Sequence, residues 1–143
     1  MSRILAVDYG TKRIGLAISD REHRIASPLA VYERRGHNQD ARYFRELVAE
    51  ERAGAIVVGL PVRSRGEEGR MAKEARAFGA WLAQVTELPL EFFDEGFTTV
   101  QAEQHLRGAG LTHRKRKTRR DMLAAQILLQ SYLDARPSRK ESE

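Results

Sequence analysis

Short apolar runs alternate with turn residues over the first part of the chain. The runs Ile4–Val7 and Ile14–Ile18 are separated by a turn through Gly10, which predicts a β-hairpin. A third run, from Ser27 to Tyr32, carries Pro28 near its start, and proline favours an edge strand because it cannot donate to a strand ladder. The pattern therefore predicts three consecutive antiparallel strands.

From Asp40 the apolar positions recur at helical spacing. They lie on one side of a helix and are Tyr43, Phe44, Leu47 and Val48. Gly54 is expected to end this helix. The next run, Ala55–Gly59, is apolar on both faces, which is typical of a central strand in a parallel sheet.

The remaining pattern predicts helices that alternate with one further strand. After a loop over Pro61–Gly66, the expected elements are a helix over Glu67–Thr86, a strand over Leu90–Asp94, a helix over Thr98–Gly108 and a last helix over Arg119–Leu133. Trp81 has helical spacing with Phe78 and Val85, so it is expected to be a core residue. The order βββαβαβα predicts an α/β fold, a mixed five-stranded sheet with helices on both faces, as in the RNase H-like fold.

The length and composition favour a single globular domain. The chain has 143 residues, of which 1–136 are expected to form the domain and 137–143 a disordered tail. No apolar stretch approaches the roughly 20 residues that span a bilayer, and no leader is expected before the first strand. The absence of cysteine excludes disulfides and catalytic thiols. These features predict a cytoplasmic protein with no membrane partner.

Positive charge is concentrated late in the chain. The net charge is +5, and six of the eight positions from His113 to Arg120 are Lys or Arg. Such a block suits a polyanion, most commonly the phosphate backbone of a nucleic acid. It also fits a solvated flexible loop, because like charges promote disorder, and a loop that becomes ordered on its ligand would satisfy both interpretations.

Three acidic residues stand out by their positions. Asp8 closes the first strand, Glu95 follows the fifth strand, and Asp121 opens the last apolar helical run. Carboxylates brought together at such ends would repel one another unless a divalent cation neutralised them. Taken singly, each also fits a turn or helix cap, and Asp121 in a first helical turn would gain from the helix dipole.

Four segments closely resemble the signature motifs of the YqgF family. They are Val7–Gly15, Val58–Pro61, Asp94–Glu95 with Phe97–Thr99, and Lys117 with Asp121 and Ala124–Ala125. The resemblance extends from Ile4 to about Leu133. Members of the family are described as Holliday-junction resolvases and as nucleases that mature the 5′ end of pre-16S ribosomal RNA. The resemblance implies an RNase H-like nuclease whose catalytic acids, Asp8, Glu95 and Asp121, hold Mg²⁺ or Mn²⁺.

Basic residues near these acids are candidates for contact with nucleic acid. Two lie in the turn after Asp8, two in the loop after the fourth strand, and four in the basic block: Lys12, Arg13, Arg63, Arg65, Arg114, Lys115, Arg116 and Lys117. Two positions depart from the family pattern. Gly96 stands where the family usually has Arg, and Arg65-Gly66 stands where it usually has Asp-Gly. These departures affect the expected positioning of substrate more than the acids.

Three functions remain open at the level of sequence. The resemblance favours a nuclease acting on structured RNA in the maturation of pre-16S rRNA. A junction-resolving endonuclease acting on branched DNA would use the same acids, and it would need two sites, as in a homodimer. A non-catalytic RNA-binding module would explain Gly96 and the basic block, but the intact set of acids argues against it. Either a monomer or a homodimer is compatible with the sequence.

Overall fold

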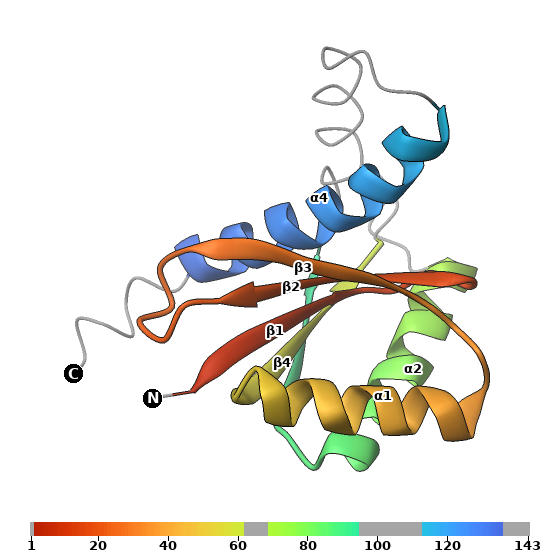
Figure 1. Ribbon diagram of the computed structural model, residues 1–143, viewed down its shortest axis with the longest axis horizontal. Helices are drawn as coiled ribbons and strands as arrows, with labels where there is room; N and C mark the ends of the chain where they lie inside the picture. The colour runs from red at the N-terminus through yellow and green to blue at the C-terminus, as the bar shows by residue number, and fades with distance from the viewer. Residues whose placement is uncertain (1, 62–68, 95–112, 136–143) are drawn as a thin grey trace.

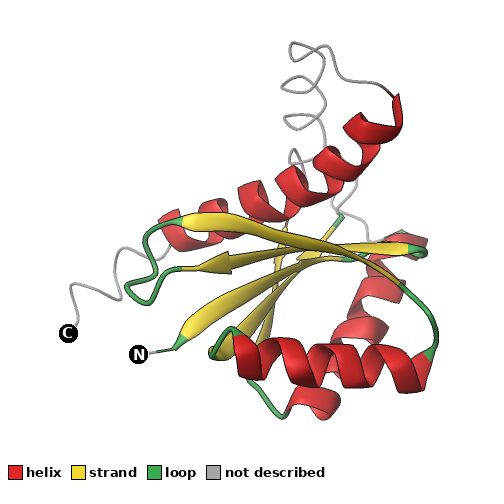
Figure 2. Cartoon of the chain, viewed as in Figure 1, coloured by secondary structure: helices red, strands yellow, loops and turns green. Residues whose placement is uncertain are grey.

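The computed structural model describes residues 2–61, 69–94 and 113–135, with only the backbone described for residues 113–120 (Figures 1 and 2). The elements are β1 (Arg3–Asp8), β2 (Arg13–Ser19), β3 (Ala26–Glu33), α1 (His37–Glu50), β4 (Ala53–Leu60), α2 (Arg70–Thr86), β5 (Leu90–Asp94) and α4 (His113–Asp134). No helix in these ranges is both long enough and apolar enough to cross a membrane.

The strands form one five-stranded sheet in the order β3-β2-β1-β4-β5. β1 pairs antiparallel with β2, and β2 pairs antiparallel with β3. β4 pairs parallel with both β1 and β5. The predicted α/β fold with a mixed sheet is therefore confirmed, and β1 lies at its centre.

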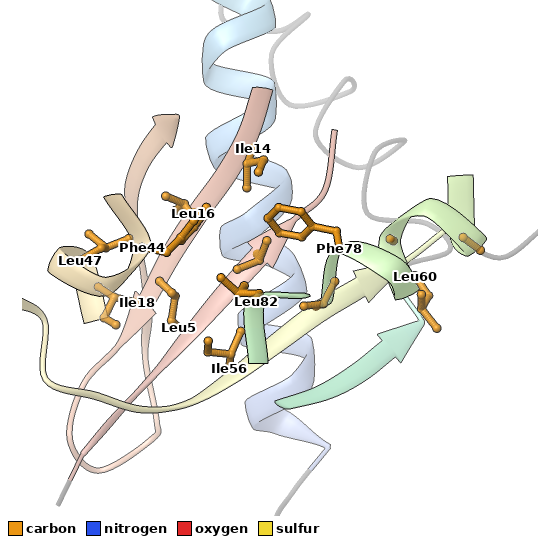
Figure 3. Packing of buried hydrophobic residues seen from close by; sticks show 14 residues of the cluster. Leu5, Ile14, Leu16, Ile18, Phe44, Leu47, Ile56, Leu60, Phe78 and Leu82 are labelled. Atoms are coloured by element: carbon orange, nitrogen blue, oxygen red, sulfur yellow. The ribbon is translucent and has the colours of Figure 1, made fainter. Parts of the chain in front are cut away.

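Helices cover both faces of this sheet. Figure 1 shows α1 and α2 on one side and α4 on the other. Successive side chains of a strand point to opposite faces, so Leu5 and Val7 belong to the core under α1 and α2, whereas Ile4 and Ala6 belong to the core under α4. Figure 3 shows the first core, in which Phe44 and Phe78 pack against side chains of β1 and β2.

Two glutamines of α4 connect that helix to the edge strand. Gln130 accepts a hydrogen bond from the backbone N–H of Ala26 at 2.9 Å and donates one to the carbonyl of Arg24 at 2.9 Å. Gln126 donates to the carbonyl of Ala26 at 3.2 Å. These bonds fix the second half of α4 across the start of β3.

The placements predicted for two strands are confirmed. β3, which contains Pro28, lies at the edge of the sheet. β4 lies between two parallel neighbours, and its residues from Ile56 to Leu60 are buried. Proline cannot donate a backbone hydrogen bond, which explains the edge position of β3. A strand that is apolar on both faces is stabilised by burial on both faces, which explains the central position of β4.

Both predicted ends of the first helix are wrong. α1 begins at His37, not at Asp40, and the backbone N–H of Asp40 already donates to the carbonyl of Gly36. The helix ends at Glu50, and Gly54 lies inside β4. The left-handed conformation expected of glycine is taken by Arg52, which has φ 55°.

The later elements agree with the sequence to different extents. α2 ends at Thr86 as predicted but begins at Arg70, after residues 62–68, which are not described. β5 has its predicted bounds. The helix predicted for Thr98–Gly108 and the tail predicted for 137–143 lie outside the described residues. Trp81 packs against the core as predicted, although it is only partly buried.

Candidate active site

Asp8 is placed by the central strand. It is the last residue of β1 and pairs with Gly15 of β2. Since Ile4 and Ala6 face α4, the two-residue period of the strand directs Asp8 to the α4 face as well. The parallel strands β1, β4 and β5 end at the same edge, where α/β proteins usually bind their ligands.

Asp121 reaches the same place from the helix. A Cβ atom added to Gly15 would lie 2.2 Å from the backbone oxygen of Asp121 and 3.5 Å from the Cβ of Ala125. Only glycine therefore allows α4 to come this close to β2. Gly15 is thus a neighbour of both acids, as the strand partner of Asp8 and through its contact with the backbone of Asp121.

Arg13 connects the turn to the helix. Its Nε lies 3.4 Å from Oδ2 of Asp121, and both side chains are about one quarter exposed, at 27% and 26%. The sequence left open whether Arg13 contacts phosphate or is merely solvated in its turn. In the structure it orients the carboxylate of Asp121, and it remains accessible enough to meet a ligand.

The start of α4 corrects the prediction for the basic block. The helix begins at His113, not at Arg119, so the block is helical and not a loop. Lys and Arg are good helix formers, which is a physical reason for this outcome. Asp121 consequently lies eight residues beyond the start of the helix. Its position is not explained by an interaction with the helix dipole in a first turn.

The third predicted acid cannot be compared with the first two. Glu95 lies outside the described residues, as do Arg63 and Arg65. Its neighbour in sequence, Asp94, ends β5 and pairs with Leu60 of β4. In the described ranges, no three His, Asp or Glu side chains come close enough together to hold a metal ion.

Among the remaining basic candidates, the structure describes the side chain of Lys12 but only the backbone of the basic block. Lys12 is exposed in the turn that follows Asp8. Arg114, Lys115, Arg116 and Lys117 lie in the first two turns of α4, where the backbone alone is described. The structure thus brings together Asp8, Lys12, Arg13 and Asp121 at one end of the sheet.

Arg34 was missed in the sequence. One of its guanidinium nitrogens lies 3.2 Å from the hydroxyl of Tyr9, 3.4 Å from the carbonyl of Gly10 and 3.4 Å from that of Thr11. Its backbone N–H donates to the carbonyl of Lys12 at 2.9 Å. Arg34 therefore holds the turn that carries the basic residues. An arginine after an edge strand gives no sequence signal for this contact.

Comparison with known proteins shows the family of this chain. The family model of RuvX, described as a Holliday junction resolvase, matches residues 2–135. A protein of Rhodopirellula baltica named "Putative pre-16S rRNA nuclease" is 48% identical over 133 residues, which are 93% of this chain and 77% of that protein. A protein of the same name from Chloroflexus aurantiacus is 44% identical over 135 residues, covering 94% and 88% of the two chains.

Solved structures with the same fold are more distant in sequence. Thermus thermophilus RuvC in complex with a Holliday junction substrate superimposes with a TM-score of 0.59 at 19% identity, covering 96% of this chain and 97% of that one. The fowlpox virus resolvase in complex with Holliday junction DNA gives a TM-score of 0.58 at 11% identity, with coverage of 93% and 97%. These likenesses support the RNase H-like fold. With the family model and the relatives they lead to one conclusion: the chain is a nuclease and belongs to the RuvX family, which is the YqgF family that its four signature segments resemble.

Proposed function

We propose that this nuclease matures the 5′ end of pre-16S rRNA, with Asp8, Glu95 and Asp121 as its catalytic acids. The observation that supports the proposal is the approach of α4 to β2 at Gly15, because Gly15 is the strand partner of Asp8 and lies against the backbone of Asp121. The names of the relatives at 44–48% identity support the RNA substrate.

The chemistry of these residues fits Mg²⁺ or Mn²⁺. Carboxylate oxygens are the preferred ligands of such hard cations, and two carboxylates close together are stabilised by a positive ion between them. Asp8 and Asp121 would hold the metal, joined by Glu95. When bound, the metal would lower the pKa of a water molecule and stabilise the leaving oxygen.

The basic residues would position the substrate strand. Lys12 is exposed beside Asp8 and can meet a phosphate oxygen. Arg13 keeps the carboxylate of Asp121 turned toward β2. The first turns of α4, whose sequence is the basic block, project away from the sheet (Figure 1), so several phosphates of a nucleic-acid backbone could follow the helix from Asp8.

A second candidate function is resolution of branched DNA. It is favoured by the description of the family model, which names a Holliday junction resolvase. Symmetric cleavage of a junction would require two active sites and hence a homodimer. A non-catalytic RNA-binding module is disfavoured, because such a module would have no need to pack Asp121 against the strand partner of Asp8.

The test is a cleavage assay with the purified protein. Structured RNA with a 16S precursor 5′ end and a four-way DNA junction are each incubated with Mg²⁺, Mn²⁺ or EDTA. We expect the RNA to be cut in the presence of metal only, and Asp8→Asn to reduce the rate at least about a thousandfold with nucleic-acid binding retained. The matched control is Asp134→Asn, the same change at the exposed far end of α4.

Each outcome of this assay separates the candidates. Cleavage of the junction without cleavage of the RNA would replace the proposed substrate. Binding without cleavage of either, in every metal, would favour the non-catalytic module. A rate in Asp8→Asn equal to that of Asp134→Asn would remove Asp8 from the catalytic acids.

A further inference from the structure

A pocket of about 470 Å³ lies on the face of the sheet opposite the two acids, between the start of α1 and α2. Its volume is within the range of about 300 to 1,000 Å³ typical of small-molecule sites. Four aromatic or heteroaromatic rings line it: Tyr9, His37, Phe78 and Trp81.

These rings form a continuous wall. The ring centroids of Tyr9 and Phe78 are 5.3 Å apart, those of Phe78 and Trp81 are 5.5 Å apart, and those of His37 and Trp81 are 5.7 Å apart. Phe78 is buried and anchors the wall in the core, whereas Trp81 is only partly buried and borders the pocket. Neighbouring rings are tilted by 47°, 40° and 75° in the same order, so a flat aromatic ligand can stack on one ring at a time.

The charged residues of the pocket favour a neutral ligand over an anion. Arg34 is its cation, with the guanidinium carbon 5.3 Å from the ring centroids of both Tyr9 and Phe78. Each carboxylate of the pocket has a basic partner: Nε of Arg34 lies 3.9 Å from Oδ2 of Asp40, and Nε of Arg70 lies 3.3 Å from Oε2 of Glu74. The pocket therefore has no surplus positive charge for the phosphate of a nucleotide.

The two carboxylates differ in their capacity to accept hydrogen bonds from a ligand. Asp40 is buried and already accepts hydrogen bonds from the hydroxyl of Tyr32 at 2.6 Å and from the N–H of Arg35 at 2.9 Å. Glu74 has a side chain that is 33% exposed. Its Oε1 accepts a hydrogen bond from the hydroxyl of Tyr9 at 3.2 Å, and its Oε2 lies 3.3 Å from Nε of the exposed Arg70, so each oxygen has one partner. Since a carboxylate has about four acceptor positions, Glu74 can receive further N–H donors.

We propose that this pocket binds the base of an unpaired nucleotide, and guanine in preference to the other bases. Guanine presents two adjacent donors, N1–H and the N2 amino group, which match the two oxygens of Glu74. Its O6 and N7 are acceptors that an arginine can meet. Adenine and cytosine place an acceptor beside their single amino group, and uracil has one N–H between two acceptors, so each would set a lone pair against the carboxylate.

The proposal deepens the proposed function and rests on it for the identity of the substrate. Tyr9 directly follows Asp8, the last residue of β1, and packs with the core on the opposite face of the sheet. A nucleic acid bound at Asp8 would reach the pocket by bending round this end of the sheet. Arg34 links the two places, since it contacts both the pocket ring of Tyr9 and the turn beyond it. The base of a nucleotide next to the cleaved bond would be captured there.

Trp81 provides a direct measurement, because it is the single tryptophan of the chain. Its fluorescence is titrated with guanosine monophosphate and, separately, with adenosine monophosphate, which carries the same charge. We expect guanosine monophosphate to quench Trp81 and to bind at least about fivefold more tightly than adenosine monophosphate. Glu74→Gln should weaken guanosine monophosphate about tenfold and remove most of the preference.

The control is Glu46→Gln on α1. Glu46 pairs with Arg42 at 3.5 Å across one helical turn, as Glu74 pairs with Arg70 at 3.3 Å, but Glu46 does not line the pocket. Glu46→Gln should bind like the wild type. Equal quenching by the two nucleotides, or equal affinity in Glu74→Gln and Glu46→Gln, would overturn the proposal. A melting temperature of Glu74→Gln within about 2 °C of that of Glu46→Gln would show that both variants are folded.

The nuclease proposal can be tested independently of the base pocket. Asp8→Asn should leave the quenching of Trp81 unchanged, because Asp8 faces the other side of the sheet. Quenching that persists in a protein without any cleavage activity would keep the base pocket and reject the nuclease assignment. Normal cleavage without selective quenching would reject the base pocket and keep the nuclease assignment.

Discussion

The two faces of the sheet are built from side chains of different size. Under α1 and α2 the strands contribute large residues, among them Leu5, Ile14 and Leu16. Under α4 the strands contribute mainly small residues, including Ala6 and Ala17, beside the glycine at position 15. Helices that pack on large side chains stay farther from a sheet than a helix that packs on alanine and glycine.

The two faces, which differ in the distance between helix and sheet, also carry different candidate sites. The close approach of α4 brings the backbone of Asp121 against Gly15, the strand partner of Asp8, and the carboxylate of Asp121 within 3.4 Å of Nε of Arg13. The wider spacing on the other face leaves a pocket walled by aromatic rings. One sheet can therefore support a compact ionic site and a roomy aromatic site, back to back, through the size of the residues that alternate along its strands.

The largest effect is expected from the glycine that permits the close approach. Gly15→Ala places a methyl group 2.2 Å from a backbone oxygen of α4, and should destabilise the protein by about 2 to 3 kcal/mol because the whole helix must move. Cleavage should fall with it. Thermal and urea unfolding measure the change in the free energy of unfolding.

Gly79→Ala is the matched change on the other face. There the new methyl group would meet the tip of the Phe92 ring at 2.6 Å, and a side chain can yield where a backbone cannot. The gain in helix propensity of about 1 kcal/mol offsets part of the clash, so the net change should stay within about 1 kcal/mol. Equal losses in the two variants would show that the faces do not differ in packing tolerance.

A smaller effect is expected from Tyr32 beside α1. Burial, and then its hydrogen bond to Asp40, raises the pKa of Tyr32 to about 12, from the usual 10.0. The raised pKa means that this contribution to stability is complete below pH 10 and is lost as pH rises from about 10 to 12. Tyr32→Phe should cost about 1 to 2 kcal/mol at neutral pH.

Unfolding of the wild type and Tyr32→Phe across that pH window is the measurement. The two free energies of unfolding should converge as pH approaches 12. Tyr43 stacks on Tyr32 with centroids 3.8 Å apart, and its own pKa is raised by burial and by Glu50, so both proteins share its titration. A constant difference between wild type and variant from pH 8 to 12 would contradict the assigned bond.

The smallest effect on stability is expected at the ion pair of the α4 face. Arg13→Gln removes a partly exposed contact and should cost less than about 1 kcal/mol. The cleavage rate should nevertheless fall about tenfold to a hundredfold, because the carboxylate of Asp121 loses its orientation. Arg42→Gln, which removes a similar pair with Glu46 on exposed α1, should change neither quantity. If the cleavage rate falls no more in Arg13→Gln than in Arg42→Gln, the ion pair between Arg13 and Asp121 has no role in catalysis.

The sheet was largely predictable because its signals are local. Pro28 marked the edge strand, the double-sided apolar run marked β4, and Asp8 was correctly expected at the end of a strand. The start of α4 was not predictable from periodicity, since the apolar positions begin only at Met122 and the eight preceding residues are almost all charged. Helix propensity, not amphipathicity, was the relevant signal there.

The site itself was only half accessible from sequence. The signature segments predicted three acids, and their catalytic role stays a prediction. The role of Gly15 as the point where α4 touches β2 depends on a contact between residues more than one hundred positions apart. The pocket could not be predicted either, because it also depends on contacts between distant parts of the chain. Helical spacing correctly assigned Trp81 to the core, but it carries no information on whether the ring also borders an open space.

The glutamines that tie α4 to β3 limit how two copies of this chain could associate. An edge strand is ordinarily a template on which a strand of another molecule can add. At the start of β3 the outward N–H and C=O of Ala26 are already occupied by Gln130 and Gln126. Extending the sheet there with a second chain would require α4 to detach, and with it Asp121. Sheet-to-sheet association at the start of β3 is therefore blocked by the same helix that carries Asp121.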